Sequence, residues 1–161
     1  MAVTSVDTDY DNLRITLIAE FDASIERVWE LWSDPRKLER WWGPPSYPVR
    51  FETHDLTPGG EAAYLMTGPD GTMRGVWRVT VVDAPTSLEF IDAFAGPDGR
   101  QIADMPVMVR VQLMAREPGT RMEMNLTFDS RDDMEKLMRT GIVEGLREAV
   151  GQIDALLLYA R

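Results

Sequence analysis

Apolar and polar residues alternate along the first part of the chain. Between residues 12 and 21, apolar side chains occupy every second position, at Leu13, Ile15, Leu17, Ala19 and Phe21. Because successive side chains of a strand point to opposite faces, this alternation predicts a strand with one buried face. The preceding residues, 1–11, show no such pattern, and we expect them to form an N-terminal tail.

The spacing of the apolar residues then changes from two to between three and four. The residues at this helical spacing are Ile25, Val28, Trp29 and Trp32. They predict a short amphipathic helix, with Trp29 and Trp32 as core anchors. Asp34 and Pro35 are suited to open a second helix, which we expect to end at about Trp42, before a Gly-Pro-Pro segment.

Strand-like segments separated by turn signals fill residues 49–129. The turns are predicted at the proline- and glycine-containing segments 58–60, 68–71, 84–86, 96–99 and 117–119. This spacing is typical of an antiparallel meander. Alternation is clearest in 107–113 and 122–128, which predicts one apolar and one polar face for the sheet.

One long helix is predicted at the C-terminal end. After Ser130, apolar residues recur at intervals of three and four, at Met134, Leu137, Met138, Ile142, Leu146, Val150, Ile153 and Leu157. A helix of this length, at 1.5 Å per residue, would extend about 40 Å. Gly141, Gly145 and Gly151 are unfavourable inside it, each by about 1 kcal/mol relative to alanine, which points to close packing, a kink or a bound ligand.

The predicted helices and antiparallel strands make this an α+β chain. Its composition and charge limit the classes of partner that it is expected to bind. Its 161 residues suit a single domain, which we place at residues 12–161. The chain has 17 basic and 27 acidic residues and a net charge of -10. Nucleic-acid and anionic-membrane binding are therefore disfavoured, because both depend on basic patches.

The residue content also limits the chemistry. The chain has no cysteine, which excludes disulfides, thiolate metal sites and cysteine nucleophiles. Neither a signal peptide nor an apolar run of about 20 residues is present, and we expect a cytoplasmic protein. His54 is the single histidine; its parity with Arg50 and Glu52 predicts a solvent-facing side chain. We expect no metal and no cofactor.

Four segments of the chain carry a likeness to one known family. They are FDASIERVWELWSDPRKLERWWGP at 21–44, DLTPGGEAAYLMTGPDG at 55–71, GVWRVTVVDAPTSLEF at 75–90 and GIVEGLREAVGQIDALL at 141–157. In this order they resemble the family related to the activator of the Hsp90 ATPase, within the SRPBCC superfamily. Thr57 departs from the pattern, since many relatives carry a basic residue there.

The resemblance implies the helix-grip fold, also called START-like or Bet v 1-like, with two short helices after the first strand. In this fold a curved antiparallel sheet wraps around a long C-terminal helix and leaves a cavity between them. By parity with the family's strands and helix, the residues expected to line the cavity are Trp42, Tyr64, Met66, Trp77, Phe90, Met124, Met138 and Ile142. Methionines in this set suit an adaptable apolar pocket.

Binding of a small hydrophobic or aromatic molecule is the function that this set favours. Acid-base catalysis would require an ionisable group with a perturbed pKa inside the cavity. The nearest polar candidates are Arg78, Asp92, Arg110 and Gln112, and their parity predicts that most of them face outward. No catalytic residues are therefore assigned, and we do not expect an enzyme.

Two alternatives stay open. One is a protein-interaction module with a chaperone as partner, or a homo-oligomer. Its weakness is that the eukaryotic co-chaperone has an additional N-terminal domain, for which we expect no room before the first strand here. The other is an enzyme resembling polyketide cyclases or aromatases, which rests on analogy of fold alone.

Overall fold

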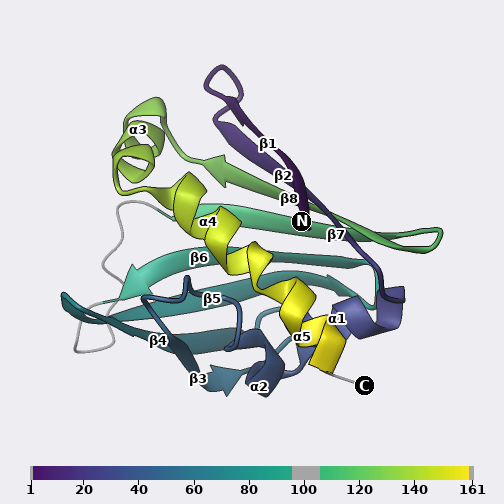
Figure 1. Cartoon of the computed structure of the whole chain (residues 1–161). Coiled ribbons are helices and arrows are strands. Elements are labelled where there is room, and N and C mark those ends of the chain that lie inside the picture. Colours follow the sequence, from purple (N-terminus) through teal and green to yellow (C-terminus); the bar gives the residue numbers. More distant parts are fainter. Residues whose placement is uncertain (1, 96–105, 160–161) are drawn as a thin grey trace.

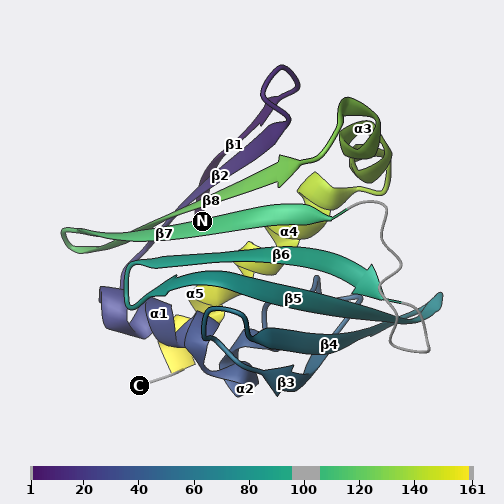
Figure 2. The ribbon, with the colours of Figure 1, turned by 180° about the vertical axis from the view of Figure 1, so that it is seen from behind.

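The computed structural model describes residues 2–95 and 106–159 and contains one curved antiparallel sheet with helices on one of its faces (Figures 1 and 2). The strands are β1 (Val3–Asp9), β2 (Arg14–Phe21), β3 (Val49–His54), β4 (Glu61–Gly68), β5 (Gly71–Asp83), β6 (Ser87–Ala95), β7 (Val107–Arg116) and β8 (Gly119–Phe128). Their order across the sheet is β1-β2-β8-β7-β6-β5-β4-β3. The predicted α+β meander is confirmed; the turn predicted at 96–99 lies outside the described residues.

The alternation seen in the sequence produces the buried face of the sheet. Strand β8 buries every second side chain from Thr120 to Phe128, while the intervening ones are half-buried. Leu17 of β2 and Val111 of β7 both lie opposite Met124 of β8, so apolar side chains of three strands meet on the same face. Such cross-strand apolar pairs stabilise the sheet and give its helix-facing side an apolar surface.

The segment predicted as an N-terminal tail contains a strand. Residues 3–9 form β1, which pairs with β2 so that Val6 lies opposite Leu17. The interpretation from sequence failed because β1 is an edge strand, in which only Val3 is buried. An edge strand with one buried residue has no apolar alternation to detect.

The two short helices after β2 are each capped by a side chain at their N-terminal end. Helix α1 (Ile25–Ser33) is capped by Ser24, whose side chain accepts a hydrogen bond from the backbone N–H of Arg27. Helix α2 is shorter than expected, covering only Pro35–Leu38, and a series of turns continues to Trp42. The amide of Trp42 donates to the carbonyl of Leu38 at 3.0 Å, which keeps this segment compact.

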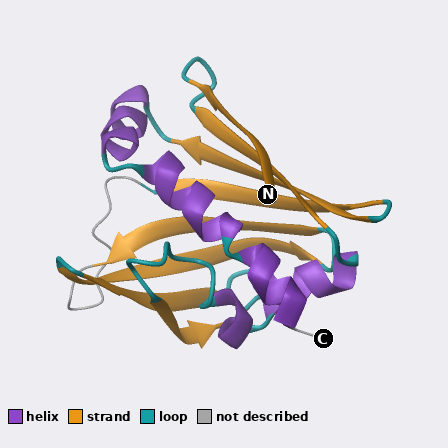
Figure 3. Cartoon of the chain, in the orientation of Figure 1, coloured by secondary structure: helices purple, strands orange, loops and turns teal. Residues whose placement is uncertain are grey.

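The C-terminal helix is divided rather than continuous (Figure 3). It consists of α3 (Arg131–Arg139), α4 (Ile142–Gly151) and α5 (Ile153–Tyr159). Gly141 separates α3 from α4 in a left-handed conformation with φ of 85°, which glycine adopts without steric cost. At the second break, Gln152 donates from Nε2 to the carbonyl of Gly43 at 2.8 Å, tying α4 and α5 to the loop after α2.

Aromatic side chains fill the space between the short helices and strands β3 to β6. We call this group the aromatic cluster: Trp32, Trp41, Trp42, Phe51, Tyr64, Trp77 and Phe90. All of them are fully buried except Trp42, which is half-buried. Trp29, by contrast, is only half-buried and packs at the edge of the core.

Within the described part of the chain, no helix combines the length and apolar character needed to cross a membrane.

Candidate functional site

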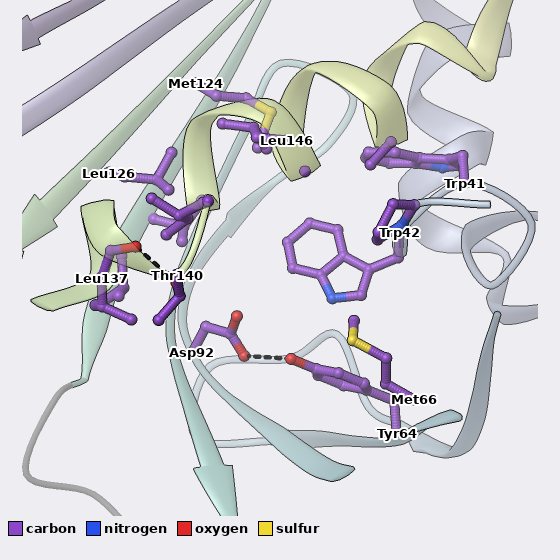
Figure 4. A pocket seen from close by; sticks show the side chains of 17 residues that line it. Trp41, Trp42, Tyr64, Met66, Asp92, Met124, Leu126, Leu137, Thr140 and Leu146 are labelled. Atoms are coloured by element: carbon purple, nitrogen blue, oxygen red, sulfur yellow. Dashed lines mark hydrogen bonds between the residues drawn. The ribbon is translucent and has the colours of Figure 1, made fainter. Parts of the chain in front are cut away.

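A cavity of about 220 Å³ lies between α4 and the helix-facing side of the sheet (Figure 4). Its walls come from the loop after α2, from strands β4, β6, β7 and β8, and from the α3–α4 junction. The lining residues are Trp41, Trp42, Pro44, Tyr64, Met66, Asp92, Val107, Val109, Met124, Leu126, Leu137, Thr140, Gly141, Ile142, Gly145, Leu146 and Ala149. Apart from Tyr64, Asp92 and Thr140, the side chains are apolar or carry only an indole N–H.

The structure brings most of the sequence-predicted cavity residues together. Trp42, Tyr64, Met66, Met124 and Ile142 all line the cavity. They come from four separate segments of the chain, which the fold brings to one place. Figure 4 shows Trp42 near the centre of this group, with its indole ring facing the open space.

Trp77 and Phe90 do not reach the cavity. Their rings stack on each other with centroids 3.9 Å apart, and the Trp42 ring packs edge-on against Trp77 at 4.8 Å. Trp42 therefore lies between this pair and the open space, and Trp77 and Phe90 support the wall from behind. Both rings are fully buried in the core.

Met138 is also outside the cavity, and its neighbour Leu137 lines it instead. The prediction assumed one continuous helix, in which Met138 and Ile142 lie four residues apart on the same face. Because Gly141 interrupts the helix, that relation between α3 and α4 is lost.

Asp92 lines the cavity, although the sequence analysis did not include it among the expected lining residues. It shares its parity on β6 with Phe90 and Leu88, both of which are buried, and it lies opposite Trp77 of β5. The signal was therefore present in the alternation, since Phe90 was itself predicted to face the cavity, but the sequence analysis expected most of the four polar candidates to face outward by parity. Arg78 and Arg110 are exposed as predicted, and Gln112 is half-buried.

Tyr64 and Asp92 form a hydrogen-bonded pair at the floor of the cavity. The Tyr64 hydroxyl donates to Oδ1 of Asp92 at 3.0 Å. Burial raises the pKa of Asp92 to about 7, although the Tyr64 hydrogen bond acts in the opposite direction. Burial, together with the nearby Asp92 charge, also raises the pKa of Tyr64 well above its usual value. Tyr64 is thus a donor at neutral pH, while Asp92 exchanges a proton in that range.

Gly75 makes this pair geometrically feasible. Tyr64 of β4 lies opposite Gly75 of β5, and its ring passes over that strand to reach β6. A Cβ at position 75 would lie 2.0 Å from Cζ of Tyr64. A side chain there would push the phenol away from Asp92.

His54 lies apart from the cavity. The prediction that its side chain faces solvent is wrong. It is half-buried, and its Nε2 lies 3.0 Å from the carbonyl oxygen of Trp32. A bulge between Phe51 and Thr53 shifts the register of β3 and reverses the expected parity. Burial lowers the pKa of His54.

Among the residues that the structure describes, no three potential metal ligands of the His, Cys, Asp and Glu types gather at one place.

Comparisons with known proteins place this architecture among solved structures. A sequence model of the family described as "Activator of Hsp90 ATPase homolog 1-like protein" matches residues 22–157. No curated protein sequence matches the chain.

Three solved structures illustrate the range of similarity. A protein from Arthrobacter aurescens is 50% identical with a TM-score of 0.92, and the match covers 96% of this chain and 91% of that one. Protein Ms6760 from Mycobacterium smegmatis is 41% identical with a TM-score of 0.89, covering 96% of both chains. A Silicibacter pomeroyi protein of the matched family is 24% identical with a TM-score of 0.72, covering 92% of this chain and 99% of that one.

Proposed function

Because the chain belongs to the activator of Hsp90 ATPase homologue 1-like family, within the SRPBCC superfamily of helix-grip folds, we propose that it binds a small apolar molecule between α4 and the sheet. The observation that carries the proposal is the cavity of about 220 Å³ with its largely apolar lining. Binding sites for small molecules are concave and mostly apolar, with a few polar groups that orient the guest. Tyr64 and Asp92 are polar groups of this kind.

The volume of the cavity limits the size of the guest. An apolar cavity of about 150 Å³ is large enough to hold benzene. The larger cavity here therefore suits one ring or two fused rings. Burying about 200 Å² of apolar ligand surface contributes roughly 5 kcal/mol before the entropy of association is subtracted, so high affinity also needs a polar contact.

Filling the cavity from the protein side is expected to prevent binding. In the Ile142→Trp variant the larger side chain, placed at the α4 wall, occupies space that the guest needs. We expect the affinity for indane, a two-ring hydrocarbon, to fall at least about tenfold because its apolar contacts are lost. Titration followed by the NMR shift of the Trp42 indole N–H measures this directly.

The matched control is Met108→Trp. Met108 is 50% exposed and lies between Val107 and Val109, which line the cavity, but it is on the opposite face of β7. This variant should bind indane like the wild type. An affinity for indane in the Ile142→Trp variant equal to that of the wild type would refute the proposed site.

Acid-base catalysis is a second candidate, favoured by one observation. Asp92 is a cavity carboxyl whose pKa, raised to about 7, lies close to neutral pH, the property that general-base catalysis requires. With a ketone guest such as 2-indanone, the carboxylate would remove a proton from the carbon next to the carbonyl, leaving the enolate, and then return a solvent-derived proton. Exchange of that hydrogen in D₂O, followed by NMR, should be faster with the wild type than with Asp92→Asn. Equal rates would exclude this candidate.

A further inference from the structure

We propose that the cavity selects guests that carry a protonated amine on an apolar ring system, with the ammonium group held by Asp92. This inference rests on the proposed function and names the class of molecule that the site would take. It depends on three properties of the cavity: a carboxylate oxygen that faces the open space, the absence of a cationic side chain in the described lining, and aromatic rings beside the carboxylate.

The first property is the unequal use of the two Asp92 oxygens. Oδ1 accepts the hydrogen bond from Tyr64. The other oxygen points into the open space toward Trp42 (Figure 4), and no described residue donates a hydrogen bond to it. A carboxylate has room for several donors, and one held in an apolar site is stabilised by each donor that it gains. A guest N–H is suited to supply a donor that the described residues do not provide.

The second property is the missing positive charge. Among the described lining residues, Asp92 and Tyr64 are the only titratable groups, and none is lysine, arginine or histidine. The arginines on neighbouring strands are directed elsewhere: Arg74 pairs with Glu52, while Arg78 and Arg110 are exposed. A half-buried carboxylate among apolar side chains is stabilised by a counter-charge, which no described lining residue supplies, so a cationic guest gains more from this position than a neutral one.

The third property is the aromatic wall. The rings of Trp42 and Tyr64 both line the space beside Asp92, with centroids 6.4 Å apart. A cation near the face of an indole or phenol ring is attracted by the negative potential of that face. The net charge of the whole chain, -10, adds a long-range attraction for cations and disfavours anionic guests.

Matched probes of one size and shape test the inference. They are 2-aminoindane, which is protonated in neutral solution, the neutral indane, and the anionic indane-2-carboxylate. At a pH of about 8.5, where Asp92 is mostly ionised, calorimetric titration should show at least about tenfold tighter binding of 2-aminoindane than of indane. Indane-2-carboxylate should bind more weakly than either.

Two further measurements assign the preference to Asp92. In Asp92→Asn, which keeps the shape but removes the charge, the affinity for 2-aminoindane should fall to within about twofold of that for indane. Lowering the pH to about 5.5 should have a similar effect in the wild type, because Asp92 becomes protonated while the amine stays charged. Binding of indane itself should change little in both cases.

The outcomes separate this inference from the function on which it rests. If indane binds and 2-aminoindane shows no preference, or if the preference survives in Asp92→Asn, the amine inference is wrong and the apolar cavity stands. Tighter binding of indane-2-carboxylate than of 2-aminoindane would overturn it as well. If none of the three probes binds, the proposed function fails and the inference fails with it.

Discussion

Replacing Trp77 with alanine is expected to lower the free energy of unfolding by about 3 to 5 kcal/mol, the usual cost of removing a large buried aromatic side chain. Trp77 is fully buried, stacks on Phe90 at an interplanar angle of 16°, and supports the ring of Trp42 from behind. Its removal leaves a void in the middle of the aromatic cluster that rigid neighbouring rings cannot fill. Urea denaturation followed by circular dichroism measures the loss.

Two matched variants show whether this loss comes from the packing of the ring. Trp77→Phe keeps an aromatic ring and removes an indole N–H that has no hydrogen-bond partner in the described structure, so we expect a loss below about 2 kcal/mol. Val81→Ala lies on the same strand at a position that is 39% exposed, and should cost less than about 1 kcal/mol. Equal destabilisation by all three variants would contradict the argument.

The second large effect is a loss of folding stability as Asp92 ionises with rising pH. Its pKa is raised from 3.8 to about 7 in the folded protein, so the native state holds a proton that the unfolded state has released over that range. The contribution of Asp92 to stability is therefore fully present below a pH of about 4 and is lost as the pH rises through about 7. Because each pKa unit corresponds to about 1.4 kcal/mol, the loss amounts to at most about 4 kcal/mol.

Asp92→Asn removes this titration and keeps the shape of the side chain. Relative to the wild type, the variant should become increasingly stable as the pH rises from about 4 to about 8, in urea denaturation at a series of pH values. Asp129→Asn is the control, because it makes the same change of a carboxylate to an amide at an exposed position outside the cavity. A flat difference between wild type and Asp92→Asn would show that Asp92 ionises without cost and would contradict its burial.

The success of the sequence analysis followed the strength of the alternation. Tyr64 and Met124 lie on strands whose buried positions recur at every second residue, and both line the cavity. Asp92 follows the same rule on β6, yet it was grouped with polar residues most of which were expected to face outward. Alternation indicates the face on which a side chain lies, whereas charge indicates only the cost of placing it there. At a ligand site the two can disagree.

Breaks in regular structure limited the rest of the prediction. The spacing of apolar residues after Ser130 fits a single helix, but the left-handed conformation of Gly141 depends on how α3 and α4 pack in three dimensions. The bulge in β3 that reorients His54 likewise leaves no mark on the spacing of neighbouring residues. A single residue added to or removed from a repeating pattern moves every later side chain of that element to a different face. A prediction that misses the break therefore assigns those side chains to the wrong face.

The passage of Tyr64 over Gly75 makes the polar part of the cavity a product of the assembled sheet. Tyr64 on β4 and Asp92 on β6 meet only when β5 lies between them in its native register, with a glycine beneath the ring. In a chain whose strands have not yet paired, Asp92 is an ordinary hydrated carboxyl and Tyr64 an ordinary phenol. The strand beyond β4 is β3, the edge of the sheet, so fraying from that side would release the Tyr64 hydroxyl before the central strands separate. The proton affinity of Asp92 therefore reports whether β3 and β4 are paired with the rest of the sheet.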